Sequence, residues 1–415
     1  MRIETICTGD ELLTGITSET NSRAFQELLL QRAGLVVRRS VVVGDLREDI
    51  IEALNQAATR CDAVLVSGGL GATSDDITAS CAAEAAGVTL VESPQVMAHI
   101  EARFAARGIA LTANNRHQAQ VPEGAEVVVN TEGAAPLIIQ KRGHCTFFFV
   151  PGVPREYQHL VTTHVVPRLI TLAGPSPTVR VLRLLKTLNL PESHLDALMT
   201  PLVPQHPHIT FGYRTHLPEN HLKLLAEAPS REEALQRLAA VERAARATLG
   251  DKCFGADDET LQGVVLAALR HRGARLALAE SCTGGMVAAL LTEIPGASDV
   301  LFGAAVTYAE EAKTLWAGVS KELLAQHGAV SSECAEAMAR GIREVTRTDW
   351  GLSVTGFAGP GGGTEANPVG TVYVGVVGPG SSHVERRTFL GDRERIRRFA
   401  SHAALDLLRR ALSAR

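Results

Sequence analysis

A serine followed by two glycines stands where an apolar segment ends and a helix-like segment begins. Leu276 to Ala279 is continuously apolar, as in a buried strand, and Glu280 to Gly285 (ESCTGG) follows it directly. A hydroxyl at such a corner lies at the carboxyl edge of a sheet, where N–H groups at the next helix start can stabilise an oxyanion. The pattern favours acyl transfer with Ser281 as nucleophile. The alternative is that Ser281 or Thr283 only caps the helix.

A serine nucleophile needs a base, and no histidine lies in the neighbouring motifs. Lys313 follows the next predicted strand and could accept the proton if burial depresses its pKa; the alternative is a solvated helix lysine. Cys282 is a competing nucleophile because a helix N-terminus lowers a thiol pKa, but its adjacency to Ser281 means that both cannot point the same way. Thr355 to Gly363 (TGFAGPGGG) follows another predicted strand and offers backbone N–H groups to a phosphate.

A second glycine-rich turn lies near the start of the chain. Ser67 to Thr73 (SGGLGAT) follows the apolar run 63–66 and precedes a helix that begins near Asp75 and Asp76. Ligands of parallel sheets bind outside the carboxyl ends of the strands, where glycines let N–H groups approach a phosphate. The two carboxylates, with Asp10 after the first predicted strand, could hold Mg²⁺. Alternatively, they only complement a helix dipole.

The elements that position these residues indicate more than one domain. A length of 415 residues favours two or three. We expect α/β class, with two doubly wound α/β domains at residues 1–175 and 256–415 joined by a small α+β domain at 176–255, after a linker at Gly174-Pro175-Ser176-Pro177. The small domain is predicted as strand, helix, strand pair and helix. Predicted strands elsewhere are 3–7, 36–43, 63–66, 145–150, 276–279, 300–307, 352–355 and 371–377; the first helices are 23–32 and 49–60, one follows Ser93-Pro94, and 259–272 opens the last domain.

The composition excludes several classes of protein. Lys plus Arg is 41 and Asp plus Glu is 45, and aromatics are 4%, so nucleic-acid binding is disfavoured. The longest uncharged stretch, 366–384, contains four Gly and two Pro, so no membrane segment is expected. Seven scattered cysteines without a CxxC pair argue against a disulfide framework or a thiolate zinc site. Acidic residues near the start argue against a secretory signal, so we expect a cytoplasmic protein.

Further motifs surround Ser281 and Lys313 and extend over nearly all of residues 259–415. They are Tyr308 to Lys313, Gly328 to Ser331, Thr355 to Gly363, Pro368 to Val372 and Gly391 to Arg393. Together they resemble the carboxy-terminal nicotinamide-nucleotide amidohydrolase domain of the CinA family (competence/damage-inducible protein A). The resemblance implies hydrolysis of nicotinamide mononucleotide to nicotinate mononucleotide and ammonia through a Ser281–Lys313 dyad, without a metal cofactor. The substrate-binding residues it suggests are Thr283, Gly284, Gly285, Tyr308, Thr355, Gly359, Gly361, Gly362 and Arg397.

The sequence departs from the family pattern beside the dyad. The family commonly has Tyr-Ser-Asn where Tyr308-Ala309-Glu310 stands, and Lys where Asn367 stands. Glu310 adds negative charge near a phosphate-bearing substrate and would raise the pKa of Lys313. Weaker activity or a shifted substrate is therefore expected.

The first domain carries its own set of family motifs. They are Gly9 to Leu13, Thr20 to Ser22, Ser67 to Gly71, Asp75-Asp76, Asn114 to Arg116 and Pro151 to Pro154. This set resembles the amino-terminal domain of the CinA family, which is similar to molybdopterin-binding domains. The resemblance implies metal-dependent ADP-ribose pyrophosphatase activity, with Mg²⁺ at Asp10, Asp75 and Asp76. The nucleotide-binding residues it suggests are Gly68, Gly69, Gly71, Asn115 and Gly152; the family usually has Pro where Ala72 stands.

The resemblance implies a K-homology-like middle domain. Nucleic-acid-binding modules of that type need a GxxG loop, which is missing between Thr178 and Leu249, so we interpret the domain as a spacer or dimer element. His206 and His208 are interpreted as surface residues. The leading hypothesis is a homodimeric, bifunctional enzyme of pyridine-nucleotide recycling. The alternatives are a non-catalytic pterin- or nucleotide-binding amino-terminal module, and an interaction protein of competence or DNA repair, which the charge balance does not favour.

Overall fold

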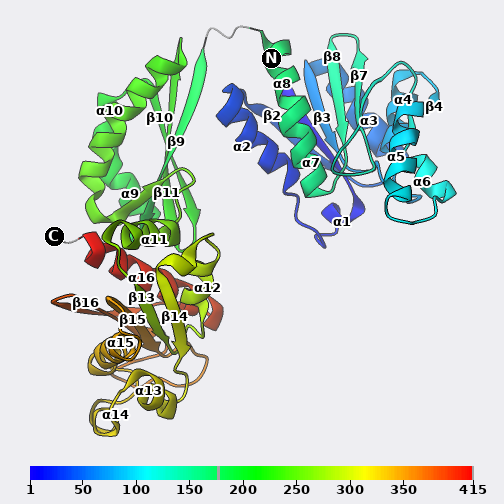
Figure 1. The fold of residues 1–415 in the computed structure, drawn as a ribbon. Helices are drawn as coiled ribbons and strands as arrows, with labels where there is room; N and C mark the ends of the chain where they lie inside the picture. Colours follow the sequence, from blue (N-terminus) through cyan, green and yellow to red (C-terminus); the bar gives the residue numbers. More distant parts are fainter. Residues whose placement is uncertain (175–177, 414–415) are drawn as a thin grey trace. The chain divides into compact units, whose positions relative to one another are not determined.

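The computed structural model describes residues 1–174 and 178–413, which form two units (Figure 1). The first unit contains residues 1–182 and 226–236, and the second contains 183–225 and 237–415. The predicted linker falls on residues 175–177, which lie outside the described residues. The three domain boundaries expected from the sequence stay a prediction.

The first unit is built on a six-stranded sheet in the order β2-β1-β3-β8-β7-β6. The α/β class is confirmed, but the sheet is mixed. β2, β1, β3 and β8 run parallel to one another, β7 pairs antiparallel with β8, and β6 pairs antiparallel with β7. Only two residues join β7 to β8, and so short a connection can join only antiparallel strands. The sheet strands are β1 (Ile3–Thr8), β2 (Val37–Val43), β3 (Ala63–Ser67), β6 (Glu126–Val128), β7 (Leu137–Arg142) and β8 (Cys145–Val150).

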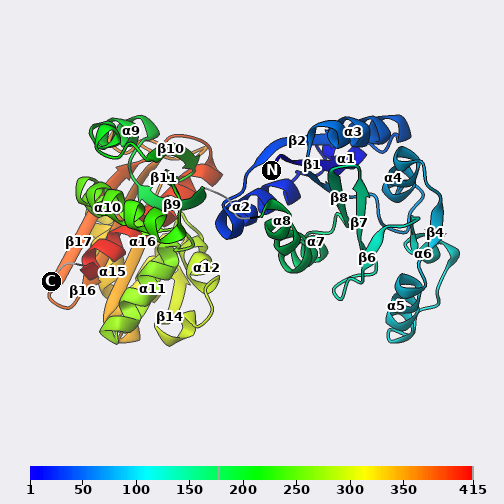
Figure 2. The same cartoon turned by 90° about the horizontal axis from the view of Figure 1, so that it is seen from above.

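Helices cover both faces of this sheet, as Figure 2 shows. Alternate residues of the buried strands point to opposite faces. Val64, Val66 and Phe147 pack with α3 and α4, and Leu65 and Phe148 pack with α2, α7 and α8. The helices are α1 (Asp10–Leu13), α2 (Asn21–Ala33), α3 (Arg47–Arg60), α4 (Thr78–Ala86), α5 (Pro94–Ala105), α6 (Ala113–His117), α7 (Pro154–Leu160), the π-helical turn Val161–Val165 and α8 (Val166–Ala173); β4 (Leu90–Glu92) pairs with β5 (Gln120–Pro122).

Most of a four-stranded sheet, in the order β10-β11-β9-β12, belongs to the second unit. The predicted order of strand, helix, strand pair and helix is confirmed. The elements are β9 (Val179–Leu188), α9 (Glu192–Met199), the 3-10 helix Thr200–Gln205, β10 (Ile209–His216), β11 (Glu219–Ala228), α10 (Arg231–Leu249), the 3-10 helix Gly250–Lys252 and β12 (Cys253–Ala256).

The second unit also contains a five-stranded sheet in the order β14-β13-β15-β16-β17. The first three strands run parallel to one another, β16 pairs antiparallel with β15, and β17 pairs antiparallel with β16. The strand β17 was not predicted from the sequence. The strands are β13 (Leu276–Glu280), β14 (Leu301–Val306), β15 (Trp350–Gly356), β16 (Thr371–Gly378) and β17 (Ser381–Thr388). The helices are α11 (Leu261–Arg272), α12 (Met286–Thr292), the 3-10 helix Ala297–Asp299, α13 (Glu310–Ala317), α14 (Lys321–His327), α15 (Ser332–Thr346) and α16 (Arg393–Ser413).

This sheet is also packed on both faces. Leu276 and Leu278 of β13 join the core formed with α11, α12 and α16, whereas Ala277 and Ala279 pack against α15. Residues as small as alanine let α15 come close to the strand. The predicted strand is therefore present and is buried on both sides.

In both large sheets, the strands that follow the central strand lie on opposite sides of it, and a predicted site lies beside this point. In the first sheet, β1 has β2 on one side and β3 on the other; in the second, β13 has β14 and β15 on its two sides. Such switch points leave a crevice outside the carboxyl ends of the central strands. The glycine turn after β3 and the Ser281 turn after β13 lie at these two crevices.

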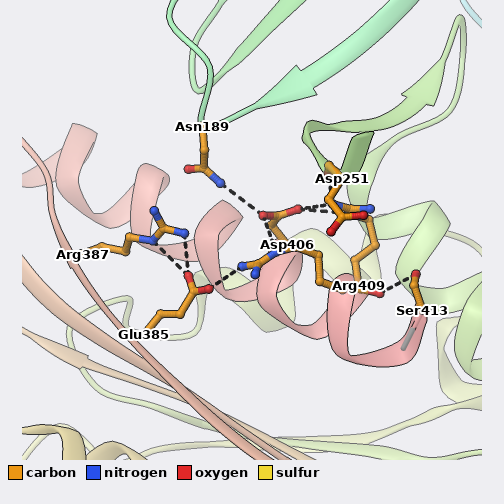
Figure 3. Close-up of polar contacts among 8 residues, drawn as sticks. Asn189, Asp251, Glu385, Arg387, Asp406, Arg409 and Ser413 are labelled. Carbon is orange, nitrogen blue, oxygen red and sulfur yellow. Dashed lines mark hydrogen bonds and ion pairs between the residues drawn. The ribbon is translucent and has the colours of Figure 1, made fainter. Parts of the chain in front are cut away.

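A buried ion-pair network joins α16 to the small sheet's connections (Figure 3). The Asp406 carboxylate, 4% exposed, accepts hydrogen bonds from Arg409 at 2.7 Å, from Arg410 at 3.2 Å and from the Asn189 amide at 3.2 Å. The Arg409 guanidinium also donates to the Asp251 carbonyl. Asp406 therefore pairs with both guanidinium groups and holds the residue after β9, and Arg410 also pairs with Glu385 at 2.9 Å.

None of the helices within residues 1–174 and 178–413 has the length and apolar character needed to cross a membrane. All seven cysteines are unpaired, as their spacing predicted.

We predict that Asp406→Ala lowers the free energy of unfolding by about 3 kcal/mol or more, because it leaves buried guanidinium charge without its partner. Urea denaturation of the full chain measures the change. The control is Glu394→Ala, which removes the exposed Glu394–Arg398 pair (3.0 Å) on the same helix and should change the free energy by about 0.5 kcal/mol at most. Equal effects of the two substitutions would contradict the assignment.

Candidate active sites

The Ser281 turn is fixed by the sheet on one side and by glycines on the other. The Ser281 N–H donates to the Val354 carbonyl of β15 at 2.9 Å, which extends the pairing of β13 by one residue. Gly284 and Gly285 have φ values of 61° and 92°, a left-handed backbone that favours glycine. The chain therefore reverses within four residues and enters α12, with Ser281 8% exposed at the corner.

The Glu280 side chain occupies the N-terminus of α12. Its carboxylate, 1% exposed, accepts hydrogen bonds from the N–H groups of Gly285 at 3.0 Å, Val287 at 3.1 Å and Ala288 at 2.8 Å. The expectation that N–H groups of this helix start stabilise an oxyanion is therefore wrong for these three donors. They already satisfy a buried charge, which stabilises the corner.

The N–H groups of the two residues after Ser281 are the remaining candidate donors to an oxyanion. Among the described residues, the N–H groups of Cys282 and Thr283 donate to no backbone carbonyl, and the Cys282 N–H lies beside its own thiol. The residue that follows a nucleophile at a strand-to-helix corner commonly contributes its N–H to the oxyanion. Burial raises the pKa of the Cys282 thiol to about 12, which disfavours its thiolate form.

Lys313 is a buried amine and not a solvated helix lysine. Its side chain is 2% exposed, and its Nζ donates to the Thr307 carbonyl at 2.9 Å. Burial lowers the pKa of Lys313, whereas Cys334, Cys282 and Glu310 act in the opposite direction. Burial therefore lowers the pKa of Lys313 and the Glu310 charge raises it, which are the two directions predicted from the sequence.

Ser281 and Lys313 line one cavity of about 260 Å³. The predicted residues Tyr308, Thr355, Gly359 and Gly361 line the same cavity. Thr283, Gly284, Gly285 and Gly362 do not. Within the described residues no hydrogen bond joins Ser281 to Lys313; nucleophile–base contacts are often long in unliganded sites.

Arg393 takes the place in the cavity that the sequence assigned to Arg397. Arg397 donates to the Thr283 carbonyl at 2.8 Å, so it holds the serine turn from outside the cavity lining. Arg393 lines the cavity, donates to the Gly359 carbonyl at 2.6 Å and contacts the Tyr308 hydroxyl. Its presence in the motif Gly391 to Arg393 was the available signal.

The two departures from the family pattern have different placements. Glu310 lines the cavity. Asn367 does not line it; its amide donates to the Val330 carbonyl at 3.4 Å and its oxygen accepts from Tyr373 at 3.1 Å. Asn367 therefore holds the glycine-rich loop in place.

The first unit contains a cavity of about 450 Å³ at the carboxyl ends of β1, β3 and β8. Predicted residues Gly68, Gly69, Gly71, Gly152, Asp75 and Asp76 line it. A side chain on Gly68 or Gly69 would meet Thr8 or Thr78 at 2.4 Å or less, so the backbone itself forms this wall. Asn21 donates to the Ser67 hydroxyl at 2.9 Å and to the Gly152 carbonyl at 2.8 Å, and so joins three segments of the rim.

The carboxylates of this cavity differ from the predicted set. Asp10 does not line the cavity; it and Asp45 accept hydrogen bonds from each other's N–H at 3.0 Å. Asp45, Glu11 and Asp75 line it, and burial, with the charges of Asp10, Glu11 and Asp75, raises the pKa of Asp45. Carboxylate oxygens are the ligands that a hard divalent cation prefers. Among the described residues, however, these three carboxylates do not bring their oxygens within 4.8 Å of one another. The signal for Asp45 was its position just after a predicted strand.

Asp76 and Asn115, two other predicted site residues, use their side chains in hydrogen bonds within their own turns. Asp76 lines the cavity but accepts hydrogen bonds from the Thr73 N–H at 2.8 Å and hydroxyl at 2.6 Å, which close the glycine-rich turn. Asn115 lies outside the lining, where its side chain accepts from the Thr112 hydroxyl at 2.7 Å and caps α6.

Comparisons with known proteins cover both cavities. Residues 258–412 match the CinA C-terminal domain, residues 4–171 a probable molybdopterin binding domain, and residues 182–255 the damage-inducible protein CinA KH domain. A CinA-like protein of Myxococcus xanthus is 53% identical over 100% of this chain and 99% of its own. One of Anaeromyxobacter is 44% identical over 99% of both chains. A solved competence damage-inducible protein A from Klebsiella pneumoniae is 38% identical, covering 37% of this chain and 95% of that one, with a TM-score of 0.36.

Proposed function

Because the chain belongs to the CinA family, we propose that its carboxy-terminal domain hydrolyses nicotinamide mononucleotide to nicotinate mononucleotide and ammonia. The observation that carries this proposal is the buried Lys313 amine in the same cavity as Ser281. A lysine acts as a base only when its amine is neutral, and burial favours that form.

The proposed reaction uses the two side chains in sequence. The Ser281 oxygen attacks the carboxamide carbon, and the Lys313 amine takes the hydroxyl proton. The same proton then passes to the departing nitrogen, so the C–N bond breaks and ammonia leaves. Water then attacks the resulting ester, and Lys313 takes a proton from this water and passes it to the Ser281 oxygen. The ester C–O bond breaks, and nicotinate mononucleotide is released.

The charges around the cavity support an anionic substrate bound at one end. The N–H of Cys282 would donate to the oxyanion. Arg393, whose guanidinium already holds Gly359 and Tyr308, is the cavity's arginine and is our candidate for the 5′-phosphate in place of Arg397. Glu310 partly opposes this charge, which agrees with the weaker activity expected from the sequence.

We predict that Ser281→Ala and Lys313→Met each lower kcat for ammonia release at least about a thousandfold, because each removes a group that acts in every turnover. Methionine keeps the apolar volume of Lys313 without its amine. Since burial of that amine costs free energy, the melting temperature of Lys313→Met should not fall.

The matched control for this pair is Lys321→Met, which changes an exposed lysine on α14 outside the cavity and should leave turnover unchanged. Ammonia release by folded Lys313→Met at the wild-type rate would refute the dyad.

We predict that Glu310→Gln moves the acid limb of the kcat/KM profile to lower pH. The lysine is active when neutral, so activity is lost as pH falls through its pKa. The Glu310 charge raises that pKa, and its removal lowers it. Glu311→Gln, the adjacent exposed residue outside the cavity, is the control and should leave the limb in place. A shift to higher pH in Glu310→Gln, or no shift, would contradict the assignment.

We also propose that the amino-terminal domain is an ADP-ribose pyrophosphatase that uses a divalent cation such as Mg²⁺. Glu11, Asp45 and Asp75 would hold the cation, with Asp10 positioning Asp45 and Asp76 closing the glycine-rich turn. When bound, the cation would neutralise charge on the phosphate oxygens. Gly68 and Gly69 line the cavity, where their backbone would face the pyrophosphate.

We predict that the full chain releases AMP from ADP-ribose with Mg²⁺ and that Asp45→Asn lowers this rate at least about tenfold. Asparagine can still accept the Asp10 hydrogen bond, so the loop should be kept. Asp49→Asn, exposed on α3 outside the cavity, is the control and should retain the wild-type rate. Tight ADP-ribose binding without AMP release would instead support the non-catalytic binding module.

A further inference from the structure

Two histidines and a glutamate meet on one face of the β10–β11 hairpin. Glu219 and His221 are the first and third residues of β11, so their side chains point to the same face. His216 is the last residue of β10, and only two residues separate it from Glu219, which places the two opposite each other in the hairpin. The hairpin therefore brings the three residues of the sequence His-x-x-Glu-x-His to one face.

The distances within this group are those of potential metal ligands. One nitrogen of each imidazole and a Glu219 oxygen all lie within 4.8 Å of one another. The His221 Nε2 and a Glu219 oxygen are 2.7 Å apart, and the two imidazole rings stack with centroids 5.5 Å apart.

The hydrogen bonding of His221 is incomplete. The side chain is 5% exposed, yet within the described residues its Nδ1 has no hydrogen-bond partner. Buried polar atoms in folded proteins are nearly always paired, and an unpaired one is a recognised sign of a missing ion or water.

A third imidazole is within electrostatic reach of the group. Burial lowers the pKa of His402 on α16 most, and the charges of Glu219 and His216 also act on it. The His402 Nδ1 lies 2.9 Å from the Arg398 carbonyl and would donate to it, which leaves the Nε2 lone pair free. Backbone-anchored imidazoles of this kind are typical around metal sites.

We propose that His216, Glu219 and His221 bind a zinc ion. Two imidazoles and one carboxylate form a ligand set typical of zinc, whereas magnesium and calcium prefer oxygen ligands alone. The site is separate from both candidate active sites: none of its three ligands lines either cavity.

The test uses the full chain, stripped of metal by a chelator and then titrated with Co²⁺. Nitrogen-containing four-coordinate sites give Co²⁺ intense visible absorption, whereas the carboxylates lining the first unit's cavity would give only weak bands. One equivalent should develop these bands, and one equivalent of Zn²⁺ should remove them. His216→Ala and Glu219→Gln should weaken Zn²⁺ binding at least about a hundredfold in competition with a coloured chelator.

The matched control is the double variant His206→Ala/His208→Ala, which removes two histidines from the same small domain outside the group and should bind Zn²⁺ like the wild type. His216 is exposed, so its substitution should leave the melting temperature of the metal-free chain unchanged. Stoichiometric Co²⁺ bands that persist in both His216→Ala and Glu219→Gln, or no intense bands in the wild type, would overturn the proposal.

Discussion

The serine turn depends on the buried Glu280 carboxylate. By accepting hydrogen bonds from Gly285, Val287 and Ala288, it joins the end of β13 to the start of α12. A buried carboxylate without such donors would be costly, so the chain must turn sharply enough to bring them within reach. That turn places Ser281 at the cavity and, among the described residues, leaves the N–H of Cys282 without a backbone carbonyl to donate to. The same interaction thus shapes the corner and limits the donors available for chemistry.

Burial acts in opposite directions on the pKa values of two groups that line the cavity with Ser281, the Cys282 thiol and the Lys313 amine. It raises the pKa of Cys282 to about 12 and lowers the pKa of Lys313, because in each case the charged form is disfavoured. A protonated thiol is a poor nucleophile, whereas a neutral amine is a usable base. A single physical cause therefore disfavours the thiolate of Cys282 and favours the neutral amine of Lys313.

The two α/β sheets share one solution to ligand placement. In each, the central strand has neighbours that wind in opposite directions, and the predicted glycine turns lie at the resulting crevice. The chemistry differs with the side chains that line the crevice. Carboxylates gather in the first unit, whereas serine, lysine and arginine gather in the second.

Features that depend on neighbouring residues were determined by the sequence itself. Continuous apolar runs identified β3 and β13, and strand-to-helix turns identified Ser281 and the glycines near Gly68. Lys313 was found from its place after the next strand. The strand β17, with exposed and half-buried residues along its length, gave no such apolar signal.

Only the tertiary structure decided features that depend on distant residues. It placed Arg393 in the cavity and Arg397 behind the serine turn, although both lie within one turn of α16. It added Asp45 to the acidic cavity and brought His402 within electrostatic reach of the His216 group. Periodicity and turn chemistry are local, whereas the direction of a side chain and the charge around it are set by segments that meet only when the chain folds.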